Sequence, residues 1–223
     1  MTGDPRGIPF WSQPEVDASI PETLWHLERH GVLAYPTETV YGFGGAIDSA
    51  SVNRLVAIKK RPDGKPFLLL ISNSAMIDRL GLQLSKSAGM LAARFWPGPL
   101  TLVLSGGEGR VPPRLRGPEG GIAVRWTSHP GLQRLISAIG DPLTSTSANR
   151  PGQPPSMSAA GILAAWKQEI ARGTLRLLDG GTLQPSAPST VIDCTGRHPR
   201  VIRPGAISVA TLRDAVPDIV GDV

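Results

Sequence analysis

Short apolar segments of strand length alternate along the chain with longer segments in which apolar residues recur at helical spacing. Val32–Tyr35 and Phe67–Ile71 are continuous apolar runs, and between them Val52, Leu55 and Val56 recur every three to four residues. The pattern predicts helices at 19–30, 51–60, 87–95, 131–139, 159–171 and 209–216, and strands at 32–35, 67–71, 100–104, 122–126, 143–145, 175–178, 190–193 and 200–203.

The order of these segments predicts an α/β fold. The last three strands follow one another without a helix, which indicates a mixed rather than a purely parallel sheet. A chain of 223 residues without a Pro/Gly-rich linker suits one domain with a sizeable core. We therefore expect a single domain over residues 17–217, after a loose N-terminal segment (1–16) and before a short tail (218–223).

Several classes of protein do not fit the sequence. No stretch approaches the roughly 20 apolar residues of a membrane-spanning helix, and residues 1–13 lack the apolar segment of a signal peptide. The single cysteine, Cys194, cannot form an internal disulfide, and paired cysteines and histidines at zinc-ligand spacing are missing. We expect a cytoplasmic protein that does not enter a membrane and holds no protein-bound metal.

Basic residues outnumber acidic ones, 23 to 18, which gives a net charge of +5. This excess favours an anionic partner such as a nucleotide or a nucleic acid. The familiar phosphate-binding motifs are absent, however. The segment 42–47 has Ile47 where a dinucleotide-binding fingerprint needs glycine, and no stretch fits the P-loop pattern. His26 and His30 lack a carboxylate at metalloprotease spacing, so we interpret them as packing or surface residues.

The candidate chemistry lies in polar clusters placed directly before or after apolar strands. Thr37 and Thr39 follow the first strand and offer hydroxyls to a small polar ligand. The segment 59–65 carries cations that can grip phosphates, arginine with a forked donor and lysine with a point charge. The segment 145–149 supplies short hydrogen-bonding side chains, and Arg125 ends an apolar strand.

Each cluster also has a plain structural interpretation. Hydroxyls in a turn can cap the backbone, and the helix dipole favours Lys59 and Lys60 at a helix C-terminus. A loop with four cations is often only a solvated surface, and Arg125 can serve in a structural ion pair.

Taken in order, seven motifs make the sequence resemble the YrdC-like threonylcarbamoyl-AMP synthase family. They cover most of the chain, from about Gly31 to Gly205, and they read YPTETVYG (35–42), KKR (59–61) followed by Lys65-Pro66, PGPLT (97–101), AVR (123–125) followed by His129-Pro130, TSAN (146–149), PSTVID (188–193) and IRPG (202–205).

The resemblance implies an open twisted mixed sheet with flanking helices and a concave basic cavity. It implies a nucleotidyltransferase that condenses L-threonine, bicarbonate or CO2 and ATP to threonylcarbamoyl-AMP, releasing pyrophosphate. The product serves the t6A modification at position 37 of tRNA, through a downstream threonylcarbamoyl-transferase complex. Mg²⁺ is expected to accompany ATP, held by phosphate and water oxygens rather than by a carboxylate cage.

The resemblance also implies roles for individual residues. Thr39, Arg125, Ser147 and Ser189 match positions that bind L-threonine. Positions that bind ATP are matched by Arg61, Lys65, Asn149 and Arg203. Lys59 and Arg61 form the Lys-x-Arg signature and are the predicted catalytic pair, and Gly121 and the segment 156–158 fall near further nucleotide contacts.

Some positions depart from the family pattern. Leu70 stands where some members have a threonine-binding histidine, and Trp126 follows Arg125 where a proline is common. Asn149 is followed by Arg150-Pro151-Gly152 instead of a small-residue turn, and the additional C-terminal domain of longer members is not expected. Two alternatives stay open: a paralogue with a changed amine substrate or without synthase activity, and a module that binds tRNA or double-stranded RNA.

Overall fold

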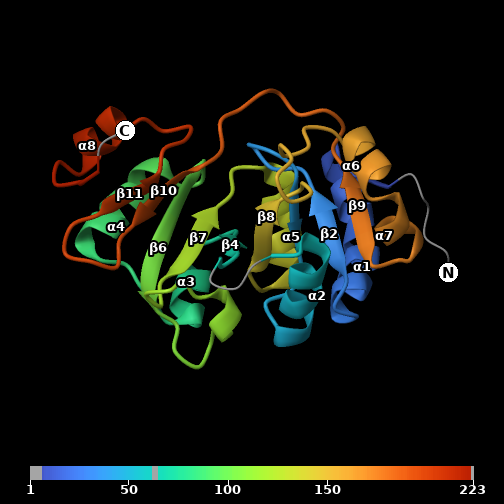
Figure 1. Ribbon diagram of the computed structural model, residues 1–223, viewed down its shortest axis with the longest axis horizontal. Helices are drawn as coiled ribbons and strands as arrows, with labels where there is room; N and C mark the ends of the chain where they lie inside the picture. Colours follow the sequence, from blue (N-terminus) through green and yellow to red (C-terminus); the bar gives the residue numbers. More distant parts are fainter. Residues whose placement is uncertain (1–6, 62–64, 222–223) are drawn as a thin grey trace.

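A single mixed β-sheet runs through the molecule and has helices on both faces (Figure 1). The structure is a computed structural model that describes residues 7–61 and 65–221. The strands stand in the order β1-β9-β2-β3-β8-β4-β7-β6-β10-β11, with β5 paired to β6. Their bounds are β1 Ile8–Pro9, β2 Val32–Tyr35, β3 Gly42–Gly44, β4 Leu68–Ile71, β5 Leu82–Gln83, β6 Leu100–Gly106, β7 Ile122–Trp126, β8 Leu143–Ser147, β9 Leu175–Asp179, β10 Thr190–Asp193 and β11 Arg200–Arg203.

The sheet contains both parallel and antiparallel strand pairs. β9 pairs in parallel with β1 and β2, β4 with β7, and β6 with β10, whereas the other neighbours are antiparallel. This arrangement confirms the predicted α/β fold with an open mixed sheet.

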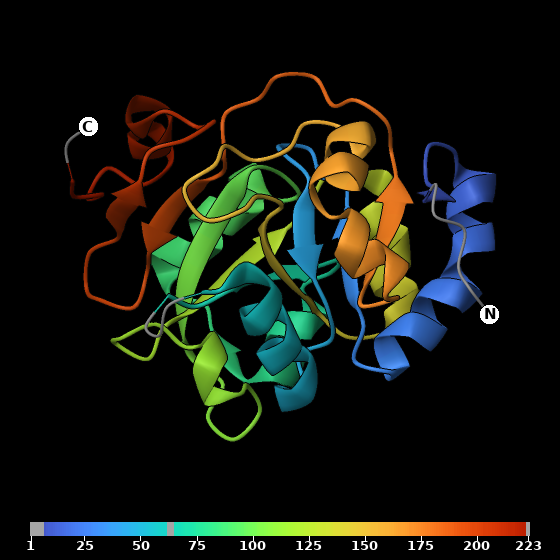
Figure 2. The ribbon, with the colours of Figure 1, turned by 45° about the vertical axis from the view of Figure 1, so that its right-hand side comes forward.

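The helices bury their apolar sides against the two faces of the sheet. Figure 2 shows α6 and α7 on one side of β9 and α1 on the other. Central strands such as β2 are completely buried, as expected for a sheet that is covered on both faces. The helices are α1 Gln13–Glu28, α2 Ser49–Lys59, α3 Ala75–Leu80, α4 Lys86–Phe95, α5 Pro130–Ile139, α6 Ala159–Ala165, α7 Lys167–Ala171 and α8 Val209–Ala215, with a 3-10 turn at Pro113–Leu115.

The N-terminal segment differs from the expectation of a loose stretch. Within its described part, Ile8 and Pro9 pair with β9, and Phe10 is buried in the core. α1 begins at Gln13 rather than near Ser19, because Ser12 and Glu15 form a capping box that starts the helix earlier. Residues 1–6 lie outside the described part, and the domain boundaries at 17 and 217 stay predictions.

Three other elements were not predicted, and one prediction was wrong in detail. β3 was missed because it consists of Gly42, Phe43 and Gly44, and glycine disfavours strands. Gly44 has a packing reason, since a Cβ there would lie 1.6 Å from the carbonyl oxygen of Thr144. The short α3 and β5 carried no clear periodicity. The helix predicted over 159–171 is two helices, α6 and α7, which meet at the buried Trp166.

One face of the sheet presents side chains for a site. Successive strand residues point to opposite faces, so alternate positions share a face. Thr101 on β6, Ala123 and Arg125 on β7, and Ser145 and Ser147 on β8 line the same cavity on this basis. The segment that joins β9 to β10 crosses the top of the molecule (Figure 1) and adds further lining residues, Ser186, Pro188 and Ser189.

Candidate active site

A cavity of about 600 Å³ lies over the middle of the sheet. Its walls come from strands β3, β4, β6, β7, β8, β10 and β11 and from the loops that follow β2, α2, β8 and β9. Hydroxyl and guanidinium groups provide most of its polar lining. The hydroxyl-bearing lining residues are Thr37, Thr39, Thr101, Ser145, Thr146, Ser147, Ser186 and Ser189, and the cationic ones are Arg61, Arg125 and Arg203.

Thr39 is held in place by a local turn. The hydroxyl of Thr37 accepts hydrogen bonds from the backbone N–H groups of Thr39 and Val40, at 3.1 and 3.2 Å. The same hydroxyl lies 3.0 Å from Thr39 Oγ1 and donates to the carbonyl of Val40. Threonine favours such side-chain-to-backbone turns, which explains why the hydroxyls cluster directly after β2.

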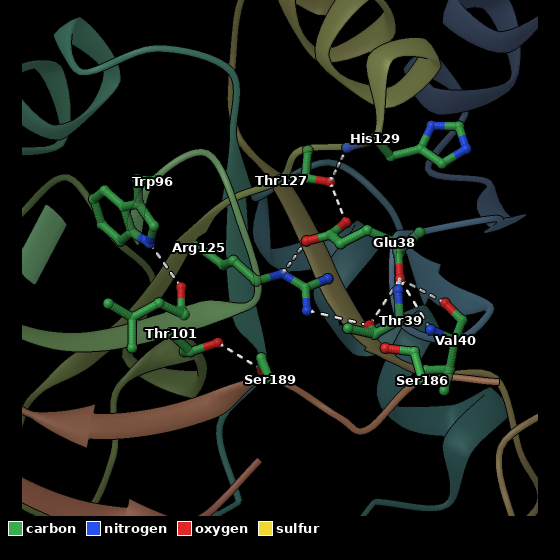
Figure 3. Close-up of polar contacts among 12 residues, drawn as sticks. Glu38, Thr39, Val40, Trp96, Thr101, Arg125, Thr127, His129, Ser186 and Ser189 are labelled. Atoms are coloured by element: carbon green, nitrogen blue, oxygen red, sulfur yellow. Dashed lines mark hydrogen bonds and ion pairs between the residues drawn. The ribbon is translucent and has the colours of Figure 1, made fainter. Parts of the chain in front are cut away.

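Arg125 is a buried cation on the floor of the cavity, 4 % exposed. Figure 3 shows it between Thr39 and Glu38. Its Nη1 donates to Thr39 Oγ1 at 3.4 Å, and its Nε lies 3.6 Å from Glu38 Oε1. Thr127 donates to the other carboxylate oxygen of Glu38 at 2.7 Å. The ion pair offered as the structural interpretation of Arg125 is therefore present, and the same side chain lines the cavity.

Ser189 joins two parts of the wall. Its hydroxyl lies 2.9 Å from Thr101 Oγ1 (Figure 3). Arg203 on β11 donates from Nη2 to the carbonyl oxygen of Ser189 at 2.8 Å and to its hydroxyl at 3.2 Å. Loss of solvent contact and the nearby charge of Arg125 both lower the pKa of the Arg203 guanidinium. The two guanidinium groups therefore lie close enough for their charges to repel each other.

Arg61 is fixed at the opposite wall, after the end of α2. Its Nε and Nη2 donate to the carbonyl oxygens of Lys65 and Pro66, both at 2.7 Å, and its Nη1 donates to Thr146 Oγ1 at 3.1 Å. The guanidinium also lies over the ring of Phe67, 4.7 Å from its centroid. These contacts orient the charge, and burial lowers the pKa of the group.

Lys59 does not line the cavity but holds a loop that does. Its ammonium group donates to the carbonyl oxygens of Ser147 and Asn149 and to Asn149 Oδ1. Asn149 Oδ1 also accepts from the hydroxyl of Ser147 at 2.7 Å. Burial, and to a smaller extent the charge of Arg61, lower the pKa of Lys59 to about 8. Lys59 thus fixes the end of β8 from behind.

A second hollow of about 340 Å³ adjoins the cavity. The two share Pro66, Ala123 and Val191. The second hollow is mainly apolar along Val103, Pro118 and Ile202, and Gly121 lies in its wall; its remaining lining residues are Gly117, Glu119, Asp193, Thr195 and Arg200. The cavity and this hollow together form a two-part space on one face of the sheet.

Most of the residues singled out by sequence meet at this space. Thr39, Arg61, Arg125, Ser147, Ser189 and Arg203 line the cavity. Lys59 and Asn149 lie behind its wall, and the side chain of Lys65 is exposed beside it. Residues 62–64 of the predicted cationic loop lie outside the described residues. The roles assigned to these residues stay predictions.

Sequence reasoning missed three residues of the site. Glu38 pairs with Arg125, Thr127 donates a hydrogen bond to Glu38, and Thr101 contacts Ser189. Glu38 and Thr101 stand inside quoted motifs, YPTETVYG and PGPLT, which was the available signal. No pattern in one sequence pairs Glu38 with Arg125, because β2 and β7 are distant in the chain.

The comparisons with known proteins agree with this geometry. A family model that groups Sua5, YciO and YrdC sequences, described as telomere recombination, matches residues 26–205. The chain belongs to this family. It is 38% identical over 175 residues to the threonylcarbamoyl-AMP synthase of Chromohalobacter salexigens, covering 78% of this chain and 91% of that one. It is 36% identical to the synthase of Pyrococcus abyssi, covering 86% of this chain and 55% of the longer relative.

Solved structures of Sua5/YciO/YrdC proteins share the fold. P. abyssi Sua5 complexed with L-threonine superimposes with a TM-score of 0.83 at 30% identity, covering 95% of this chain and 62% of that chain. E. coli YciO gives a TM-score of 0.78 at 28% identity, covering 92% and 97%. The chain is therefore a homologue of threonylcarbamoyl-AMP synthases with a YrdC-like fold.

Within residues 7–61 and 65–221, His, Cys, Asp and Glu side chains form no group of three or more that could hold a metal ion. None of the helices in this part of the chain has both the length and the apolar character needed to cross a bilayer.

Proposed function

We propose that the chain is a threonylcarbamoyl-AMP synthase that joins L-threonine, bicarbonate or CO2, and ATP, and releases pyrophosphate. The observation that carries the proposal is the cavity itself, which is lined both by hydroxyl groups, among them those of Thr39 and Ser189, and by the guanidinium groups of three arginines. Such a cavity suits a small amino acid at the hydroxyl-rich side and a polyanion at the cationic side.

The amino acid would lie at the side of Thr39 and Arg125. Arg125 Nε is buried and faces Glu38, but Nη1 makes only a long hydrogen bond, to Thr39, so the outer end of the guanidinium retains donors for a carboxylate. Arginine suits this task because its donors match the two oxygens of a carboxylate. Ser147 and Ser189 supply hydroxyls nearby. Leu70 pairs with Arg125 in the β4–β7 ladder and replaces the histidine of some members with an apolar group.

ATP would lie along Arg61 and Arg203. Both guanidinium groups face the cavity and are held by carbonyl oxygens, so their charges are fixed in advance. The adjoining apolar hollow offers a wall for the adenine ring beside Gly121. Mg²⁺ would arrive bound to ATP and keep its phosphate and water ligands, which is the ion's usual habit at triphosphates. Lys65, exposed at the edge, would reach the outer phosphates.

The reaction would need alignment and charge stabilisation more than proton transfer. The threonine amine would take up CO2 to give a carbamate, and a carbamate oxygen would then attack the α-phosphorus while the bond to pyrophosphate breaks. One contribution is that the cavity holds the two reactants together, and the other is that it neutralises charge on the phosphate oxygens. Each can lower the barrier by roughly several kcal/mol. In this proposal Arg61 supplies the charge, and Lys59 positions the Ser147–Asn149 loop.

The test is pyrophosphate release by the purified protein with ATP, Mg²⁺ and bicarbonate. Release that depends on L-threonine supports the proposal, and its absence contradicts it. Release with another amino acid instead identifies the paralogue with a changed substrate. RNA binding that is lost at physiological salt and insensitive to ATP would favour the RNA-binding module. In the leading proposal the product passes to a threonylcarbamoyl-transferase complex that modifies tRNA.

A further inference from the structure

Glu38 differs from the other groups around the cavity because it is acidic. Three arginines line the cavity, and among the described residues Arg125 has an ion-pair partner, Glu38, 3.6 Å away. Arg61 and Arg203 donate instead to carbonyl and hydroxyl oxygens. The charge of Arg125 is thus compensated by protein, whereas no carboxylate among the described residues compensates the other two arginines in this way.

The carboxylate of Glu38 is held independently of Arg125. Thr127, which is fully buried, donates to Glu38 Oε2 at 2.7 Å, and the backbone N–H of His129 donates in turn to Thr127 Oγ1 at 3.2 Å (Figure 3). The facing atoms, Glu38 Oε1 and Arg125 Nε, are both buried and lack hydrogen-bond partners. Glu38 therefore neutralises Arg125 without occupying its donors.

From this geometry we propose that Glu38 is a specificity-determining residue that reserves Arg125 for a zwitterionic amino acid and excludes phosphate groups. The inference rests on the proposed function, since it assumes that an amino acid and a triphosphate share the cavity. A neutral Arg125–Glu38 pair still binds a carboxylate through hydrogen bonds. It offers little net attraction to a multiply charged phosphate, because each phosphate charge near Arg125 also meets the charge of Glu38.

Without Glu38 the cavity would hold three uncompensated arginines. Arg125 and Arg203 already act on each other's charge, so a polyanion that bridges them would be strongly favoured. Pyrophosphate or the ATP triphosphate would then compete with the amino acid at Arg125. Glu38 thus keeps the amino acid and the polyanion at separate ends of one cavity.

The experiment measures binding by calorimetry, without turnover, with inorganic pyrophosphate and L-threonine as probes. In the unmodified protein we expect saturating pyrophosphate to change the Kd for threonine by less than about twofold. In Glu38→Gln we expect pyrophosphate to bind about tenfold tighter and to displace threonine competitively. The matched control is Glu22→Gln, which makes the same charge change at a surface pair with Arg176, and we expect wild-type behaviour from it.

A third variant separates charge from position. Thr127→Val keeps the carboxylate but removes its hydrogen bond, so we expect weaker threonine binding while pyrophosphate still does not compete. Tighter pyrophosphate binding in Glu22→Gln, or no gain in Glu38→Gln, overturns the inference. Competition between the two ligands in the unmodified protein overturns it too, even if Glu38→Gln does not fold. Failure of the unmodified protein to bind either ligand contradicts the proposed function instead.

Discussion

Arg203 donates from one nitrogen, Nη2, to both the carbonyl oxygen and the hydroxyl of Ser189, at 2.8 and 3.2 Å. Arg203 is predicted to bind ATP and Ser189 to bind the amino acid, so this contact joins the two halves of the site. A change that moves the backbone of Ser189 is therefore expected to affect Arg203 as well.

Ser189→Ala removes the hydroxyl acceptor of this contact and keeps the carbonyl acceptor. The carbonyl bond to Arg203 stays, while the hydroxyl that faces Thr101 is lost. We expect KM for threonine to rise about 5- to 20-fold, the usual effect of one hydrogen bond, while KM for ATP changes about twofold or less. Steady-state kinetics with each substrate varied in turn measure both. An equal rise in the two constants would contradict the assignment of Ser189.

Arg61→Ala is expected to weaken nucleotide binding. The guanidinium is oriented by the carbonyl oxygens of Lys65 and Pro66, so its loss removes a fixed charge and raises Kd for ATP about 10- to 100-fold. Lys65→Ala should raise the Kd for ATP by a smaller factor, because the Lys65 side chain is exposed. The control is Arg54→Ala, an exposed α2 residue that contacts Arg29. Thr39→Val should instead weaken threonine binding, and an effect on ATP alone would be evidence against this division.

The lowered pKa of Lys59 leads us to expect that kcat/KM depends on pH. Its pKa is lowered to about 8, so the ammonium is charged below that pH and loses a proton as the pH rises through it. The neutral amine has two N–H groups for three acceptors, and the loop at Asn149 is then held less firmly. We expect kcat/KM to fall above about pH 8. Lys59→Arg stays charged, so its pH profile should lose this alkaline decline if the variant retains activity; an unchanged decline would assign it to another group.

Gly205, in the IRPG motif, packs against the segment that carries Ser189. A Cβ at Gly205 would lie 2.3 Å from the carbonyl oxygen of Pro188 and 2.6 Å from the carbonyl carbon of Ser189. Gly205→Ala should therefore lower the free energy of unfolding by about 1–3 kcal/mol and weaken binding of both substrates. Gly89→Ala is the control, because nothing lies within 4 Å of a Cβ there and alanine favours the helix, α4, by about 1 kcal/mol. Thermal and urea unfolding measure both; equal stability would contradict the packing argument.

Much of the fold follows from local patterns in the sequence. The buried strand Val32–Tyr35 is a continuous apolar run, Ile122–Trp126 is apolar except for Arg125, and the positions of both were predicted correctly. β3 was not, because Gly42 and Gly44 meet a tertiary demand, close packing against Tyr35 and Thr144, that local propensity does not contain. The order of the strands in the sheet was also beyond single-sequence patterns.

The site shows the same division. Arg61, Arg125 and Ser189 could be named from motifs, because a motif records residue types at fixed spacing. The contacts between them could not. Glu38 meets Arg125, and Lys59 meets Asn149, only after distant strands and loops come together in the fold. The resemblance identified most of the residues, including Lys59 and Asn149 behind the cavity wall, and the structure supplied the contacts that hold them in place.

The place of β10 beside β6 has a consequence for synthesis of the protein. Thr190 lies opposite Leu100. The part of the cavity wall formed by β6 and β10 is therefore complete only after residues synthesised long after β6 have been added. A nascent chain that has emerged from the ribosome only as far as Asp179 already contains Thr39, Arg61 and Arg125 but lacks Ser189 and Arg203. The cavity wall is therefore complete only after Arg203 has emerged.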